Sequence, residues 1–196
     1  KNWFNIGGKT KLYFKADNLK ELIKFLKKIQ NKEKIFVLGA GSNTLIPDKQ
    51  FDGVVIKLNN SFKNISLLND EIIIAGSAVN DKSLSVFAME NGLGGFEFLS
   101  CIPGTIGGGI KMNAGCFQRE FKDIIISIQA INKLGKVVTI PAKEINFKYR
   151  DCGLPDDLIF LSASFKGFKK DKNIIKNEIN LLKEKKEQAQ PTKIKT

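Results

Sequence analysis

The feature that most constrains this chain is a glycine-rich segment, residues 101–115, which reads CIPGTIGGGIKMNAG. Five of its last twelve residues are glycine, and the others are mostly apolar rather than the serine and proline of a flexible linker. Because glycine has no Cβ, its backbone adopts a positive φ freely and its N–H can come within hydrogen-bonding distance of a phosphate. We therefore interpret the segment as a cradle for a phosphate-bearing ligand rather than as a plain surface turn.

Composition indicates an ordinary globular protein. The chain has 196 residues, 42% of them hydrophobic and 27% charged, which suffices for a buried core in one domain or two small lobes. No apolar run reaches the roughly 20 residues of a membrane span, and the first residues lack the apolar core of a signal peptide. We expect a cytoplasmic monomer without membrane insertion. Because the chain opens on lysine and stops directly after a helical pattern, we also expect it to be part of a longer protein.

The side chains exclude several kinds of catalysis. Histidine is absent, which removes Ser-His and Cys-His nucleophiles and histidine-containing zinc sites. The cysteines, Cys101, Cys116 and Cys152, have no paired spacing and are odd in number, so we expect free thiols and no metal. A bound organic cofactor is then the most economical source of reactivity.

The net charge of +12 comes from 30 lysines and two arginines against 20 acidic residues. Proteins that read nucleic acids favour arginine beside aromatic residues, whereas these lysines are scattered along every segment. We therefore expect no nucleic-acid partner, although a basic nucleic-acid-binding module remains the third alternative. A positive field still attracts anionic small molecules such as nucleotides.

Hydrophobic periodicity predicts a mixture of helices and strands. Asp17 or Asn18 is expected to cap the first helix, and Asn80 or Asp81 the second. A short buried strand is expected over residues 35–38, immediately before a Gly-Ala-Gly-Ser-Asn loop. The other strands are expected over residues 11–16, 53–58, 71–75, 123–132, 136–140 and 158–165, and the helices over 19–31, 81–91 and 171–190.

Two glycine motifs resemble known nucleotide-binding loops but lack residues that those loops require. Residues 39–44 begin like a dinucleotide fingerprint, but Thr44 takes the place of its last glycine and Pro47 prevents the required helix. Residues 104–109 have the outer glycines of a P-loop, but Met112 stands where a hydroxyl would hold magnesium. The first loop can still donate N–H and side-chain hydrogen bonds to a pyrophosphate, and an ordinary β-turn explains it equally well.

Tyr149 and Arg150 form a third candidate site. In a chain that otherwise uses lysine, an arginine can mark a position that needs a planar fork of donors. A surface ion pair of Arg150 with Asp151 or a nearby glutamate is the alternative.

Six motifs in order resemble the UDP-N-acetylenolpyruvoylglucosamine reductase family. They are the opening NWFNIGG, LGAGSN at 38–43, GFEFL at 95–99, IPGTIGG at 102–108, MNAG at 112–115 and the Tyr149-Arg150 pair. The resemblance implies an α+β fold, a two-lobed FAD-binding domain of the vanillyl-alcohol-oxidase (PCMH) type, with a third, substrate-binding domain outside this chain. It places lobe one at about 1–60, lobe two at about 61–166, and a helix and linker toward the third domain at 167–196.

The resemblance also implies an activity and a site. Such enzymes hold FAD non-covalently and use NADPH to reduce UDP-GlcNAc-enolpyruvate to UDP-N-acetylmuramate in peptidoglycan synthesis. Arg150 is implied as the catalytic cation, because hydride addition builds negative charge on the substrate carboxylate; Tyr149 and Arg150 are implied to bind the substrate. The residues implied to hold FAD are Gly39, Ala40, Gly41, Ser42, Asn43, Ile102, Pro103, Gly104, Thr105, Gly107, Gly108, Met112, Asn113 and Phe117.

The chain departs from the family pattern in two places. Cys116-Phe117-Gln118 stands where relatives have Ala-Tyr-Gly, so the phenolic hydroxyl expected beside the cofactor is missing. The serine proton donor and a later catalytic glutamate of the family lie beyond Thr196. Another FAD-dependent oxidase or dehydrogenase of the same superfamily is the alternative, and the Tyr149-Arg150 pair argues against it.

Overall fold

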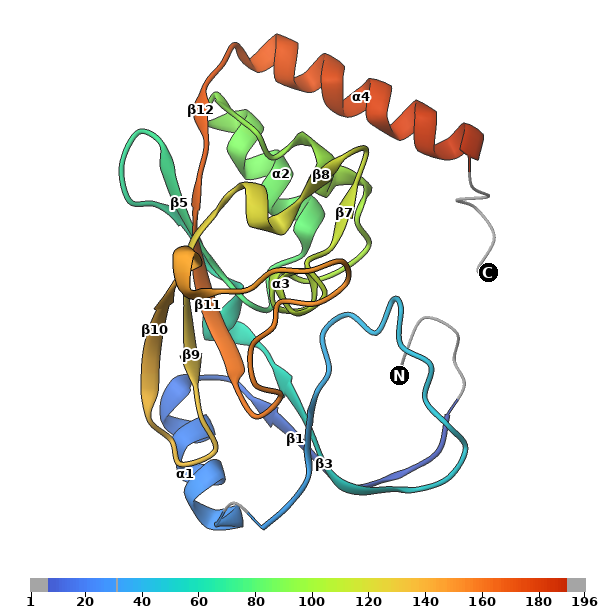
Figure 1. Cartoon of the computed structure of the whole chain (residues 1–196), viewed down its shortest axis with the longest axis vertical. Coiled ribbons are helices and arrows are strands. Elements are labelled where there is room, and N and C mark those ends of the chain that lie inside the picture. The colour runs from blue at the N-terminus through green and yellow to red at the C-terminus, as the bar shows by residue number, and fades with distance from the viewer. Residues whose placement is uncertain (1–6, 31, 190–196) are drawn as a thin grey trace.

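The computed structural model describes residues 7–30 and 32–189, which form two sheets along the long axis of the molecule (Figure 1). The first sheet has the order β1-β3-β2 and is parallel throughout. Its strands are β1 (Thr10–Ala16), β2 (Ile35–Val37) and β3 (Phe51–Leu58). The strand predicted over 35–38 was expected to be buried, but Phe36 is 42% exposed. That prediction was wrong because β2 is an edge strand of a small sheet.

Helix α1 (Leu19–Ile29) begins as its sequence predicts. The Asn18 side chain accepts a hydrogen bond from the backbone N–H of Glu21 at 2.9 Å, which satisfies one of the unpaired donors at the helix start. The predicted apolar stripe buries Leu22 and Leu26. These two side chains belong to a core shared by both sheets, because it also includes Ile159 at the start of a strand of the second sheet.

The second sheet is antiparallel, with the order β10-β9-β11-β5-β4. Its strands are β4 (Ile65–Leu67), β5 (Ile72–Gly76), β9 (Ile125–Ile131), β10 (Val137–Pro141) and β11 (Ile159–Lys166). Helices α2 (Asp81–Glu90) and α3 (Ile106–Lys111) pack beside it. Asn80 precedes α2 as expected, but neither Asn80 nor Asp81 makes a side-chain capping bond.

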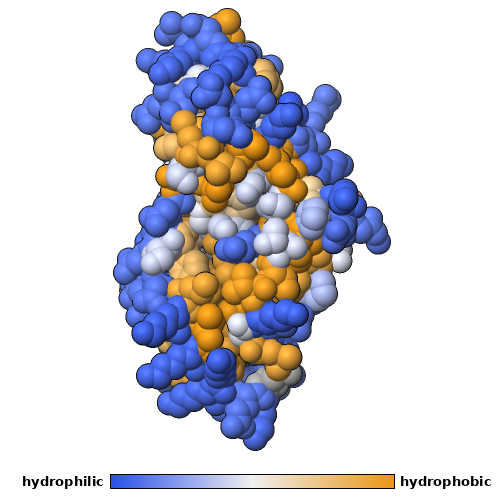
Figure 2. Space-filling view, turned by 90° about the vertical axis from the view of Figure 1, so that its left-hand side faces the viewer, coloured by the Kyte–Doolittle hydropathy of each residue, from blue (hydrophilic) through white to orange (hydrophobic). Residues whose placement is uncertain are grey.

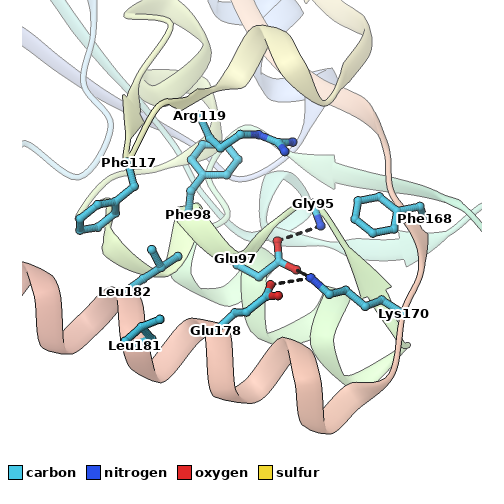
Figure 3. Close-up of a pocket in the computed structure, with 10 residues that line it drawn as sticks. All are labelled: Gly95, Glu97, Phe98, Phe117, Arg119, Phe168, Lys170, Glu178, Leu181 and Leu182. Atoms are coloured by element: carbon cyan, nitrogen blue, oxygen red, sulfur yellow. Dashed lines mark hydrogen bonds and ion pairs between the residues drawn. The ribbon is translucent and has the colours of Figure 1, made fainter.

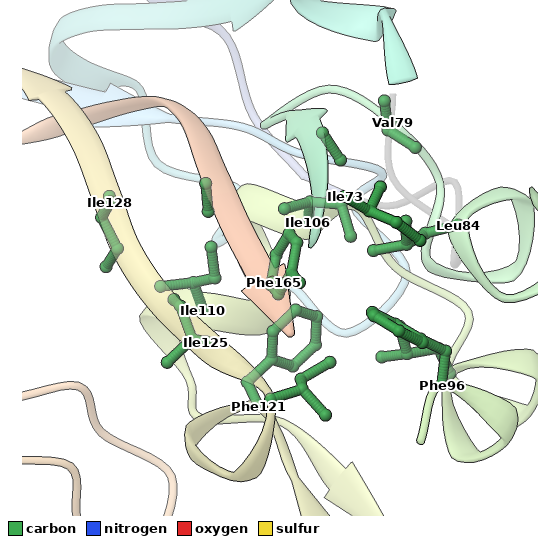
Figure 4. Close-up of a cluster of buried hydrophobic side chains, with 14 of the residues drawn as sticks. Ile73, Val79, Leu84, Phe96, Ile106, Ile110, Phe121, Ile125, Ile128 and Phe165 are labelled. Carbon is green, nitrogen blue, oxygen red and sulfur yellow. The ribbon is translucent and has the colours of Figure 1, made fainter. Parts of the chain in front are cut away.

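The main core lies between this sheet and the two helices, and three phenylalanines are central to it (Figure 4). The ring of Phe165 makes edge-to-face contacts with Phe96 and Phe121, with centroids 6.5 and 6.1 Å apart. All three rings are buried. Such pairs add about 0.5–1.5 kcal/mol beyond the burial of their area, so they help to hold the chain at Phe96 and Phe121 against β11.

The remaining elements are short, except for α4 (Lys172–Ala189), which crosses one end of the molecule (Figure 1). Strand β6 (Leu93–Gly94) pairs with β12 (Phe168–Lys169), and β7 (Gly115–Cys116) pairs with β8 (Arg119–Glu120). The 3₁₀ turns are η1 (Asn60–Lys63), η2 (Glu97–Cys101), η3 (Phe121–Asp123) and η4 (Ala142–Glu144). Among the described residues no helix is long and apolar enough to span a membrane.

Figure 2 shows how hydropathy is distributed over one face of the molecule. Hydrophobic side chains gather across the middle of this face, and hydrophilic ones crowd its two ends.

The glycine segment contains a helix that the sequence did not predict. Residues 106–111 form α3, and two of its glycines differ in what surrounds them. A Cβ on Gly109 would lie 2.3 Å from the Phe121 ring, whereas a Cβ on Gly108 would meet only Thr105 Oγ1 at 3.6 Å. Gly109 is therefore required by packing.

We expect Gly109→Ala to lower the free energy of unfolding by about 1–3 kcal/mol, because the added methyl group overpacks the core at Phe121. Gly108→Ala is the matched control and should not be destabilising, since alanine favours a helix and finds ordinary space there. Denaturant unfolding of the two variants without ligand measures the difference. Equal stability of the two would contradict this account.

Candidate functional site

Two glycine loops from different sheets meet at the middle of the molecule. The loop of residues 39–43 follows β2, and Gly41 has a φ of +69°. A Cβ on Gly39 would lie 2.5 Å from Thr105 Oγ1, so a larger residue here would collide with the Thr105 side chain. The structure thus brings together the loop at 39–43 and the segment at 104–108, both of which we predicted as parts of one site.

The glycine segment is held in place by backbone hydrogen bonds to residues 77–81, which join β5 to α2. Gly107 N–H donates to Ser77 O at 2.8 Å, and Ile106 N–H donates to Val79 O at 2.9 Å. Asp81 N–H donates in return to Gly104 O at 3.2 Å. We call this set of bonds the backbone ladder. These bonds satisfy N–H groups at the start of α3, which have no partner within the helix. A glycine-rich sequence has a low helix propensity, so α3 depends on them.

The two loops present several unused donors. Within the described part of the chain, the N–H groups of residues 39–43 donate no hydrogen bond, and neither do those of Thr105 and Gly108. Successive unpaired N–H groups in a tight loop form an anion-binding concavity. Gly39 lies so close to the Thr105 side chain that there is no room for a Cβ, and both loops carry unpaired N–H groups. This arrangement fits a pyrophosphate group.

Tyr149 and Arg150 line a separate hollow of about 460 Å³ beside the β7–β8 hairpin. Arg150 has a φ of +58°, and its guanidinium carbon lies 5.1 Å from the centre of the exposed Tyr149 ring. Arg150 forms no ion pair among the described residues, and Asp151 instead accepts a bond from the Gly153 N–H. The pKa of Glu120 is lowered chiefly by Lys122 and in part by the charge of Arg150, so the guanidinium still interacts with this carboxylate at longer range. The role of Arg150 as a ligand-binding cation stays a prediction.

The hollow carries mixed charge. A hydrogen bond from Lys122 lowers the pKa of Glu120, so this carboxylate stays ionised. Burial raises the pKa of the Cys116 thiol to about 12, which leaves it protonated and unreactive at neutral pH. The residues that line it are Gly115, Cys116, Gln118, Arg119, Glu120, Lys122, Asp123, Tyr149 and Arg150.

Asn113 connects this hollow to the glycine segment. Its side chain is buried, donates to Glu120 Oε2 at 2.9 Å and to Lys148 O at 3.1 Å, and accepts from Lys122 N–H at 3.1 Å. Through these hydrogen bonds Asn113 holds the backbone at Lys148, next to Tyr149, in place. Met112, directly before it, ends α3 and is half exposed.

Phe117 lies on the opposite side of the hairpin. Phe117 and Gln118 have φ values of +51° and +62°, which two-residue hairpin turns of type I′ require at both central positions. The Phe117 ring points toward Leu181 and Leu182 of α4 and lines a second hollow of about 260 Å³ (Figure 3). The sequence implied only a place near the cofactor for this residue.

Helix α4 is fixed to the same region by a partly buried charge network. Lys170 Nζ lies 3.5 Å from Glu97 Oε1 and also contacts Glu178 of α4 (Figure 3). Glu97 additionally accepts the N–H of Gly95 at 2.8 Å. Near the other end of α4, Lys186 donates to the Cys101 carbonyl. Sequence reasoning assigned no role to these charges, because their partners lie far away in the sequence.

Comparisons with known proteins identify the family of this chain. A family model described as an FAD binding domain matches residues 10–141. The UDP-N-acetylenolpyruvoylglucosamine reductase of Pelagibacter ubique (strain HTCC1062) is 68% identical over 195 residues, covering 100% of this chain and 65% of the relative. The reductase of Rickettsia felis (strain ATCC VR-1525 / URRWXCal2) is 44% identical over 196 residues, covering 99% and 65%.

A solved structure leads to the same conclusion. UDP-N-acetylenolpyruvylglucosamine reductase (MurB) from Thermus caldophilus superposes with a TM-score of 0.83 at 26% identity, covering 95% of this chain and 66% of that one. The predicted resemblance and the predicted FAD-binding fold are therefore confirmed. The chain spans about two thirds of the length of these relatives. By sequence, fold and the geometry of its glycine loops, the chain belongs to the FAD binding domain family.

Proposed function

We propose that this chain is the FAD-binding portion of a cytoplasmic, NADPH-dependent reductase that converts UDP-GlcNAc-enolpyruvate to UDP-N-acetylmuramate. The observation that carries the proposal is the 68% identity, over the whole chain, to a protein named as that reductase. The division into lobes at about 1–60 and 61–166, and the monomeric state, belong to the same proposal.

FAD is held by the two glycine loops in this proposal. Its pyrophosphate accepts hydrogen bonds from the free N–H groups of residues 39–43, Thr105 and Gly108. Ile102 and Pro103 precede this cradle, and Met112, Asn113 and Phe117 follow it. When bound, FAD supplies the hydride that reduces the substrate.

Arg150 is the residue that we assign to catalysis. Hydride addition to an unsaturated carboxylate builds negative charge on the carboxyl group, and a fixed cation stabilises that charge in the transition state. The Arg150 guanidinium has no carboxylate partner in the described chain and is placed over the Tyr149 ring, so it can bind a substrate carboxylate with two donors. The serine proton donor and the later glutamate are assigned to the remaining third of the reductase.

If the cradle binds FAD, the chain should take up this cofactor, and replacing Gly39 should weaken its binding. We expect the wild-type chain to retain a flavin absorbance spectrum after incubation with FAD and desalting. Gly39→Ala should weaken FAD binding at least tenfold, because its methyl group meets Thr105 Oγ1 at 2.5 Å. Equilibrium dialysis measures both affinities.

Two controls accompany that measurement. Leu134→Ala changes an exposed residue in the β9–β10 turn and should bind FAD as the wild type does. Adding Thr105→Ala to Gly39→Ala removes the colliding oxygen and should recover part of the loss, relative to Thr105→Ala alone. A colourless wild-type chain, or full affinity in Gly39→Ala, would refute this use of the cradle.

The assignment of Arg150 is tested in a protein that carries this chain together with the remaining third of the reductase. We expect Arg150→Lys to leave the reduction of FAD by NADPH unchanged and to slow reduction of the enolpyruvyl substrate on the order of 10²- to 10³-fold, the usual loss of one preorganised donor. Stopped-flow absorbance separates the two half-reactions. Arg119→Lys is the matched control, since Arg119 is already paired with Asp123 at 3.6 Å. An equal fall in both half-reactions would refute the assignment.

A further inference from the structure

A buried carboxyl group lies directly behind the glycine segment without a partner. Asp81 is the first residue of α2 and is 0% exposed. Neither of its carboxyl oxygens has a hydrogen-bond partner among the described residues. The buried hydroxyls of Ser77 and Ser85 are unpartnered as well. Unsatisfied buried polar groups are uncommon in folded proteins and require an explanation.

The carboxyl group faces Gly104, the residue that opens the cradle. Asp81 binds Gly104 through its own backbone N–H, and Asp81 Oδ2 lies 2.6 Å from the place where a Cβ on Gly104 would stand. The side chain therefore occupies the space directly behind Gly104. Thr105, the next residue, bridges to Asn80 and contacts Gly39. Gly104 and Thr105 thus link the Asp81 side chain to the two loops that present the free N–H groups.

No charge compensates this carboxyl group. Gly104 is neutral, and no ion pair or hydrogen bond from the described residues reaches the carboxyl oxygens. The other charged residues of α2, Lys82 and Glu90, are exposed. Burial alone raises the pKa of Asp81 to about 8. The carboxyl group is therefore largely protonated at neutral pH.

We propose that Asp81 is a positioning residue of the FAD site, whose protonated carboxyl group supports Gly104 and whose ionised form opposes FAD binding. The inference rests on the proposed binding of FAD by this cradle. A carboxylate at this place adds negative charge behind loops that receive the two negative charges of a pyrophosphate. It also draws water or a donor into a space that the neutral form leaves dry.

Thermodynamic linkage gives the sign and size of the effect. If FAD binds only the protonated form, the affinity is constant below the pKa of Asp81 and falls up to tenfold per pH unit above it. Asparagine has nearly the same shape and cannot ionise, so Asp81→Asn should bind FAD with an affinity that does not change through this range. Asp70→Asn, at an exposed aspartate in the β4–β5 turn, is the matched control.

The test is the dissociation constant of FAD at pH 6 to 9, from flavin fluorescence titration of the three proteins. We expect all three to agree within a few-fold at pH 6. The wild type and Asp70→Asn should then lose affinity above pH 8 while Asp81→Asn does not. A wild type that binds FAD with the same pH profile as Asp81→Asn would overturn the inference. A wild type that binds no FAD at pH 6 would instead refute the proposed function.

A second measurement needs only the wild type, in case Asp81→Asn does not fold. The shift in thermal midpoint that saturating FAD produces should be largest at pH 6 to 7 and should shrink above pH 8. A shift that stays constant from pH 6 to 9 would overturn the inference. Without FAD, the folded state holds the Asp81 proton more tightly than the unfolded state, so this group makes stability fall as pH rises from about 4 to about 8.

Discussion

The structure depends on the backbone ladder between residues 77–81 and 104–107. These bonds attach a glycine-rich segment, which has little tendency to order by itself, to the junction between β5 and α2. With its inner N–H groups used by Ser77 and Val79, the segment keeps the N–H groups of Thr105 and Gly108 without a hydrogen bond in the described chain. The Phe121 ring packs against Gly109 from the core, and the loop at 39–43, which follows β2 of the first sheet, lies against Thr105. The cradle is therefore a product of both sheets.

The glycines have two different physical roles, which the sequence alone does not separate. Gly109 is needed by packing, whereas Gly39 leaves room for the Thr105 hydroxyl and Gly41 has a positive φ. The sequence shows glycine in each case and does not separate these roles. The charges show a similar division, because Lys170 contacts Glu178 of α4 and Glu97 of η2, while Arg150 has no ion pair in the described chain and acts on Glu120 only at longer range.

Sequence reasoning located most regular elements and the region of the site, because these follow from local signals. The spacing of Leu22 and Leu26 and the Asn18 cap define α1, and the apolar runs define β5, β9, β10 and β11 of the second sheet, whereas β4 was not predicted. Helix α3 was not predicted, since its bonds come from residues nearly thirty positions earlier. The position of Asp81 could not be predicted either. An aspartate at a helix start is ordinary, and only tertiary burial leaves its carboxyl oxygens without hydrogen-bond partners. Residues 2–6 of the opening motif lie outside the described residues.

The central claim is that unpaired backbone N–H groups on both glycine loops hold the pyrophosphate of FAD. Amide hydrogen exchange of the wild-type chain, measured residue by residue with and without FAD, tests it most directly. The account predicts that FAD slows exchange at residues 39–43, Thr105 and Gly108, while amides of the β9–β10 turn are unaffected. Bound FAD that protects neither loop would contradict it.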